Sequence, residues 1–234
     1  MRITSVTFAS LLCVAAIGCN KDGDTSVDQT AAELAVDSSD SGQTEGAVMS
    51  SLFEGTELAA GLAAPTAEEV AQRIWDRAKS RYSPAGCFTA TRNGAVVDLT
   101  LNGCTGPRGL RTVTGAIHIV GSVTATGDFQ AVATAQDLQV NAAIMDINST
   151  AVYSPSAKTL SVTTAGAGVG PLGNDIARTG AYTVAFDANC ATVDGAWATS
   201  IGDAARSTTV QMQRCKDTCP TGSVVHTGRL GRTI

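Results

Sequence analysis

The sequence predicts a mainly β fold: an antiparallel up-and-down meander of about ten strands, either a curved sheet or a barrel, with one capping N-terminal helix. Two observations lead to this prediction. From Cys87 onward, Thr, Val, Ala and Ile alternate with polar residues, which is the period of a half-buried strand. Turn signals also recur every 8–16 residues, as in an all-β meander.

The segment from Pro65 to Tyr82 (65–82) is the predicted helix. Thr66, followed three residues later by Glu69, fits a capping box, and Ser83-Pro84 ends the helix because the residue before proline disfavours helical geometry. Its apolar stripe consists of Ala67, Val70, Ala71, Ile74, Ala78 and Tyr82. We expect this helix to cover an open face or end of the sheet.

Three hairpins can be placed by register, because turn chemistry and apolar pattern must agree across a pair of strands. The Asn93-Gly94 turn predicts that Phe88 pairs with Leu99 and Ala90 with Val97. The Gly127-Asp128 turn predicts that Ile117 pairs with Leu138 and Val123 with Val132. The Gly202-Asp203 turn predicts that Val193 pairs with Met212. The remaining strands are expected at 143–153, 158–168, 176–186 and 223–227. One apolar face should contain Ile117, Ile119, Val123, Leu138, Val140, Val193 and Trp197.

The charge divides the chain into a tether and a domain. Residues 19–64 contain nine acidic residues against Lys21 alone, a net charge of −8, and their polar composition predicts a disordered acidic tether. The tether also contains four large apolar residues, which predict either a short docking helix or a marginal helix of the linker: Leu52, Phe53, Leu58 and Leu62. Residues 65–234 are nearly neutral, with 14 basic and 12 acidic residues, so they lack the basic face that nucleic-acid binding needs.

The sequence contains no recognisable catalytic motif, and we predict a protein that is not an enzyme and has no cofactor or metal. His118 falls on the polar face of its strand, and His226 lies near the end of the chain. We predict that both are surface histidines and not catalytic residues. The rival hypothesis is an envelope hydrolase. It requires His118 or His226 within hydrogen-bond reach of a carboxylate or hydroxyl in a cleft.

The N-terminus predicts export. Arg2 and the weakly apolar run from Ile3 to Val14 are typical of a signal peptide, here residues 1–18, and are too short to span a membrane. The stretch Ala16-Ile17-Gly18-Cys19 resembles the lipobox of bacterial lipoproteins. The resemblance implies cleavage before Cys19, a diacylglyceryl thioether on its sulfur with palmitate-type acyl chains, and membrane attachment. Asn20 favours outer-membrane sorting, because an Asp there would resemble an inner-membrane retention signal.

Five cysteines remain after Cys19, in a compartment where disulfides persist. The Gly202-Asp203 register places Cys190 opposite Cys215 and predicts a cross-strand bridge. Cys87 and Cys104 are the second predicted pair, for which the chain must curl back near Asn102-Gly103. Cys219 is left over: it competes for Cys190, stays free, or pairs between molecules.

Several short elements together suggest a family. They are Cys87, Cys104-Thr105-Gly106-Pro107, Gly170-Pro171, Trp197, Arg214-Cys215 and Cys219-Pro220. Over residues 85–228 this set is similar to a group of uncharacterised, Thr/Gly-rich predicted lipoproteins of myxobacterial type, and the resemblance implies no activity.

The leading hypothesis is an envelope-anchored, non-catalytic lipoprotein with a structural, adhesive or ligand-binding role. Its expected partners are the membrane, through Cys19, and an apolar ligand or another protein. A curved sheet capped by one helix also resembles the half-barrels of periplasmic lipid carriers. The alternative hypothesis is therefore a carrier of an apolar ligand on the concave face, which requires a cavity that the helix does not fill.

Overall fold

The computed structural model describes residues 66–105, 112–215, 219 and 221–227. The predicted signal peptide 1–18, the lipidation site Cys19 and the tether 19–64 lie outside the described residues.

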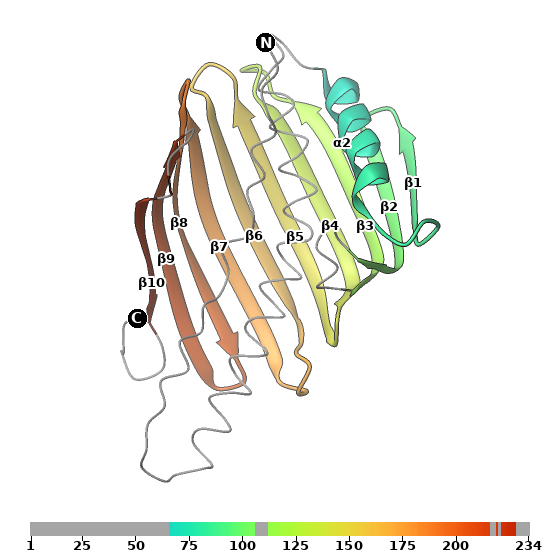
Figure 1. Cartoon of the computed structure of the whole chain (residues 1–234), viewed down its shortest axis with the longest axis vertical. Helices are drawn as coiled ribbons and strands as arrows, with labels where there is room; N and C mark the ends of the chain where they lie inside the picture. The colour runs from blue at the N-terminus through green and yellow to red at the C-terminus, as the bar shows by residue number, and fades with distance from the viewer. Residues whose placement is uncertain (1–65, 106–111, 216–218, 220, 228–234) are drawn as a thin grey trace.

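Ten strands form one antiparallel sheet in which each strand pairs with the next along the chain. The strands are β1 (Phe88–Asn93), β2 (Val96–Thr105), β3 (Thr112–Val123), β4 (Phe129–Val140), β5 (Ala143–Ser154), β6 (Thr159–Val169), β7 (Asp175–Phe186), β8 (Cys190–Ile201), β9 (Ala204–Cys215) and β10 (Thr221–Thr227). The predicted meander is confirmed. The sheet is curved and does not close into a barrel, since β1 and β10 are its two edges (Figure 1).

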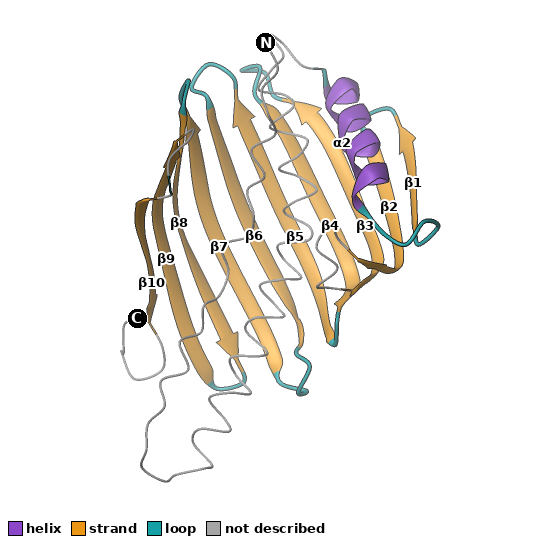
Figure 2. Ribbon diagram, viewed as in Figure 1, coloured by secondary structure: helices purple, strands orange, loops and turns teal. Residues whose placement is uncertain are grey.

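The helix α2 (Ala67–Arg81) begins and ends within two residues of the prediction. Its capping box is confirmed: the Glu69 amide donates to Thr66 Oγ1 at 3.2 Å, and the Thr66 amide donates to Glu69 Oε2 at 2.9 Å. The helix packs on β1, β2 and β3 (Figure 2). Val70 and Ile74, on the apolar side of the helix, are buried. We call the sheet face that carries α2 the inner face, and the opposite one the outer face.

The inner face is apolar far beyond the helix. Strand alternation places Phe129, Leu160 and Val184 on it, and all three are nearly inaccessible to solvent. Burial raises the pKa of the Tyr153 phenol on the same face. The core is therefore one continuous layer from β2 to β8.

The last predicted hairpin has the correct register. Ile201 pairs with Ala204 across Gly202-Asp203, so Val193 lies opposite Met212. Gly202 has a φ of 52°, which a residue with a Cβ adopts at a cost. Trp197 lies on the inner face with Val193, as predicted.

The first predicted hairpin is wrong by two residues. Phe88 pairs with Leu101 and Ala90 with Leu99, because the two central positions of the turn are Gly94 and Ala95 and not Asn93 and Gly94. Glycine, with a φ of 57°, takes the first of these positions. The shift of two preserves the inner and outer faces.

The second predicted hairpin is also wrong. Ile117 pairs with Ala135 and Val123 with Phe129, because Thr124–Asp128 forms a five-residue loop. The Thr124 hydroxyl accepts from the Asp128 amide at 3.1 Å and closes that loop. Val123, expected in the core, is 45% exposed at the strand end. A bulge at Asp137, with a φ of 51°, returns Leu138 to the inner face.

Both predicted disulfides are present, Cys87–Cys104 and Cys190–Cys215. Cys190 and Cys215 are direct cross-strand partners. Cys104 reaches Cys87 because the register shifts after Leu101, at Gly103 with a φ of 63°. The curl predicted at Asn102-Gly103 is confirmed.

We predict that the double variant Cys190→Ser/Cys215→Ser loses about 3 kcal/mol of unfolding free energy, because the bridge closes a loop of about 25 residues in the unfolded chain. Urea denaturation of the oxidised protein measures the loss. Cys219→Ser is the matched control, since Cys219 is exposed and forms no disulfide. A loss below about 1 kcal/mol would show that β8 and β9 hold together without the bridge.

Candidate functional site

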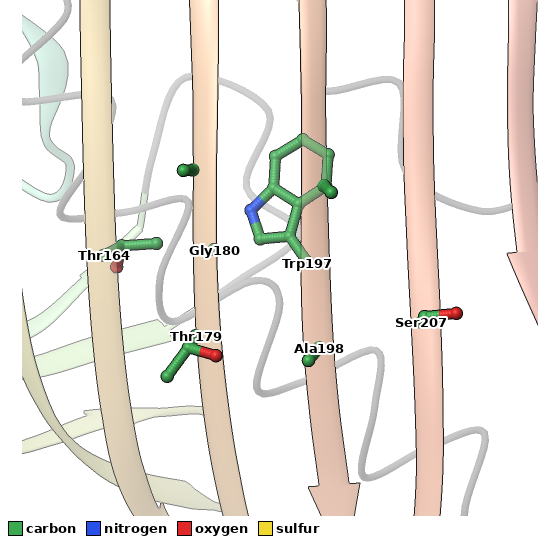
Figure 3. A pocket seen from close by; sticks show the side chains of 8 residues that line it. Thr164, Thr179, Gly180, Trp197, Ala198 and Ser207 are labelled. Carbon is green, nitrogen blue, oxygen red and sulfur yellow. The ribbon is translucent and has the colours of Figure 1, made fainter.

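The inner face of β7 and β8 carries an aromatic pair built on two glycines. Trp197 on β8 lies directly across from Gly180 on β7, and Tyr182 lies across from Gly195. Figure 3 shows the indole of Trp197 reaching toward Gly180 on the neighbouring strand. A Cβ on Gly180 would lie 2.1 Å from Trp197 Cδ1, so the indole occupies the space that any other residue would need.

The second half of the pair repeats this packing in the opposite direction. A Cβ on Gly195 would lie 2.3 Å from Tyr182 Cβ. The two aromatic rings then meet, with centroids 5.7 Å apart and planes tilted by 34°. Each strand therefore supplies one ring and one glycine, which fixes the register of β7 on β8.

Positive charge lies beside this aromatic pair. The Arg178 guanidinium carbon is 5.9 Å from the Trp197 ring centroid, a cation–π distance. Arg206 and Arg214 on β9 share the inner face, since strand alternation gives all three the same side. The strand carboxylates lie exposed on the outer face, at Asp98, Asp146, Asp175 and Asp194.

A row of polar side chains crosses the inner face at the level of Trp197. Ser149 Oγ donates to Thr164 Oγ1 at 2.8 Å, and both residues are buried. Thr164 is the cross-strand neighbour of Gly180, and Thr208 is the neighbour of Trp197. Thr208 Oγ1 in turn hydrogen-bonds His226 Nδ1 at 2.9 Å. This row interrupts the apolar layer at its centre.

Two shallow depressions, of about 460 and 520 Å³, lie over β6–β9, are open to solvent and share Ala181 and Ala196. Alanines and the hydroxyl, amide and carboxylate groups of the outer face line them. The first depression also touches Thr164, Gly180 and Trp197, which alternate to the inner face. We call this region the outer trough and define it by Ser161, Thr163, Thr179, Thr183, Asp194, Ser207, Thr209 and Gln211. Gln211 Nε2 donates to Asp194 Oδ2 at 3.4 Å within it. The trough offers donors and acceptors along four strands and no enclosed apolar space.

His118 and Asp98 meet on the outer face of β3 and β2. Their Nδ1 and Oδ1 atoms are 2.5 Å apart, and the side chains are 51% and 55% exposed. Thr134 and then Asn148 continue the row on β4 and β5. Both histidines thus reach a partner of the kind that a hydrolase needs, a carboxylate for His118 and a hydroxyl for His226. The His118–Asp98 pair, however, lies on open sheet and not in a cleft.

Other predicted site residues are accounted for more simply. Cys87, Cys104, Cys190 and Cys215 form the two disulfides, and Cys219 is exposed and unbridged. Among the described residues no three His, Cys, Asp or Glu side chains gather as a metal site. No helix in the described part of the chain has the length and apolarity to cross a membrane. Cys19 lies outside these residues.

Comparison with known proteins gave no relative: no family model, no curated protein and no solved structure matches the chain.

The sequence alone did not lead us to two of these features. The Asp98–His118 pair depends on the β2–β3 register, and the residues joining those strands carry no two-residue turn signal. The glycine–aromatic pairs did leave a signal, because Gly180 and Gly195 are isolated glycines inside strand patterns and mark close approach.

We predict that Gly180→Ala destabilises the protein by about 1–3 kcal/mol, the usual cost of overpacking, because its methyl group collides with the Trp197 indole. In the Trp197→Ala background the same substitution should cost much less, since the indole is gone. A double-mutant cycle by urea denaturation measures this coupling. Equal costs in both backgrounds would contradict the packing of the indole on Gly180.

Proposed function

We propose that this protein is a lipid-anchored, non-catalytic module of the bacterial envelope that presents its outer face to an extended, hydroxyl-rich polymer such as a polysaccharide. The outer trough is the observation that supports this function most. It is shallow and open, and it combines hydroxyl, amide and carboxylate groups with alanines across four strands, so it suits several weak contacts along a chain rather than enclosure of a small molecule.

The chemistry of the trough suits a neutral, polar ligand. Asp194 can accept two sugar hydroxyls, and Gln211, whose amide donates to it, holds its carboxylate in place. Ser161, Thr183 and Asp194 are successive cross-strand partners on β6, β7 and β8, and Gln211 follows on β9. Neighbouring strands are about 4.8 Å apart. A polymer lying across the strands could therefore make a contact at each one.

The anchoring part of the proposal rests on the sequence at Cys19, where small residues precede a single cysteine between an apolar run and an acidic tether. A tether of 45 residues between Cys19 and Pro65, taken wholly as a coil, would hold the domain at most about 35–40 Å from the bilayer, close enough for an envelope polymer to be in reach. Outer-membrane sorting remains part of this proposal.

A second candidate is a carrier of an apolar ligand. What favours it is that α2 packs on β1–β3 while the apolar inner face continues to β8. A bound mass that organic solvent releases from the native protein would favour this function over polymer binding.

We predict that Cys19→Ala moves the protein from the membrane fraction to the soluble fraction, because it removes the only sulfur that the lipobox presents for acylation. Immunoblotting of fractionated cells measures the change. Cys219→Ser should stay with the membrane. A Cys19→Ala protein that still sediments with membranes would contradict lipid anchoring.

We predict that the soluble Cys19→Ala protein binds immobilised envelope polysaccharide, and that adding Asp194→Ala weakens this binding about tenfold, as expected for loss of one hydrogen bond to a charged group. Biolayer interferometry measures the affinity. Thr89→Ala/Thr91→Ala is the control, since these residues lie on the outer face of β1, away from the trough. An equal loss in the control, or no binding at all, would contradict the proposal.

A further inference from the structure

The inner face requires a cover that α2 does not supply. The helix packs on β1, β2 and β3. Nevertheless, Ala151 on β5 and Leu160 on β6 are 0% and 1% exposed, as buried as Val97 beneath the helix at 0%. An apolar sheet face is stable in water only when a second layer packs on it. The second layer over β4–β8 is therefore missing from the described elements.

The chemistry of this face restricts what can cover it. From β4 to β6 it is mainly apolar, with Phe129, Met145 and Val162 buried on it, and the buried Ser149–Thr164 pair is its polar interruption. Toward β9 it carries the guanidinium groups of Arg178, Arg206 and Arg214. A cover that fits has large apolar side chains in one part and carboxylates close to them.

We propose that the occupant is a segment of this chain, residues 45–64, which lie outside the described residues and directly precede α2. Its sequence has the required chemistry: Leu52, Phe53, Leu58 and Leu62 are apolar, and Glu54 and Glu57 lie between them. Residues 19–64 as a whole carry a net charge of −8, opposite to that of the arginines.

The place where this segment joins the domain supports the assignment. The first turn of α2 lies against the end of β3 and the start of β4: a Cβ on Gly121 would be 3.5 Å from the Ala67 carbonyl oxygen and 3.4 Å from the Phe129 ring. The chain before Thr66 therefore meets the sheet at the border of the area that α2 covers. It can continue over β4 without crossing the helix.

The length of the segment also fits. Residues 52–62, taken as a helix, extend about 16 Å at 1.5 Å per residue. The five strands from β4 to β8 span about 19 Å at about 4.8 Å per interval, so such a helix reaches across most of them. A second copy of the protein fits less well, because its inner face repeats the same arginines while Asp98, Asp146, Asp175 and Asp194 lie on its outer face.

Hydrogen–deuterium exchange on the full mature chain carrying Cys19→Ala tests this docking. We expect the amides of residues 52–62 to exchange at least tenfold more slowly than random coil. The variant with Leu52, Phe53, Leu58 and Leu62 all changed to Ser should lose that protection and bind a hydrophobic dye. The control Val27→Ser/Leu34→Ser/Val36→Ser, elsewhere in the same tether, should behave as the parent.

A charge variant gives an independent check. Arg206→Glu should reduce the protection of residues 52–62 at least threefold, whereas Arg92→Glu, on β1 and far from β9, should leave it unchanged.

Random-coil exchange of residues 52–62 in the parent protein overturns the proposal, and this result does not depend on whether any variant folds. A solvent-extractable bound mass would then identify an apolar ligand as the occupant, and a dimer in light scattering would identify a second copy. Polysaccharide binding by the outer trough is unaffected by any of these results, so the two proposals fail separately.

Discussion

The fold depends on one constraint: a single layer of strands has two faces, and a face that is apolar needs a covering partner in water. Ten strands in sequential order make the whole sheet one layer, so the inner face must be continuous and covered. The helix meets this need at β1–β3, and its capping box holds its first turn in place. The two disulfides lie near the two edges of the sheet: one ties the start of the edge strand β1 to β2, and the other joins β8 to β9, the neighbour of the edge strand β10.

Two glycines on the inner face allow aromatic side chains to pack directly against the backbone. At Gly180 and Gly195 the missing side chains leave room for Trp197 and Tyr182, so aromatic rings lie on backbone where the layer would otherwise be thin. This packing keeps two large rings on a strand pair that no described helix covers. The outer face follows from the same alternation, because the residues between the core positions are mostly Thr, Ser, Ala and Gln. The buried inner face and the polar outer face are two consequences of one strand pattern.

The sequence predicted what local chemistry determines. The class of fold, the helix with its cap, and the strands from 143 to 227 followed from periodicity, and the Gly202-Asp203 turn gave both a register and the Cys190–Cys215 bridge. Errors arose where the turn used other residues than the expected dipeptide, as Gly94-Ala95 does between β1 and β2 and the loop closed by Thr124 does between β3 and β4. A bulge at Asp137 also changed the register. The Asp98–His118 contact and the outer trough depend on several registers at once, and no single turn encodes them.

The central claim is that the chain covers its own inner face in solution. Carbene footprinting of the full mature Cys19→Ala protein, read by mass spectrometry, tests it most directly because the reagent labels side chains that solvent reaches. The account predicts that Met145, Leu160 and Val162 are labelled as weakly as Val97, which lies under α2. Strong labelling of β5 and β6, with β2 still protected, would contradict it and leave the inner face open to another occupant.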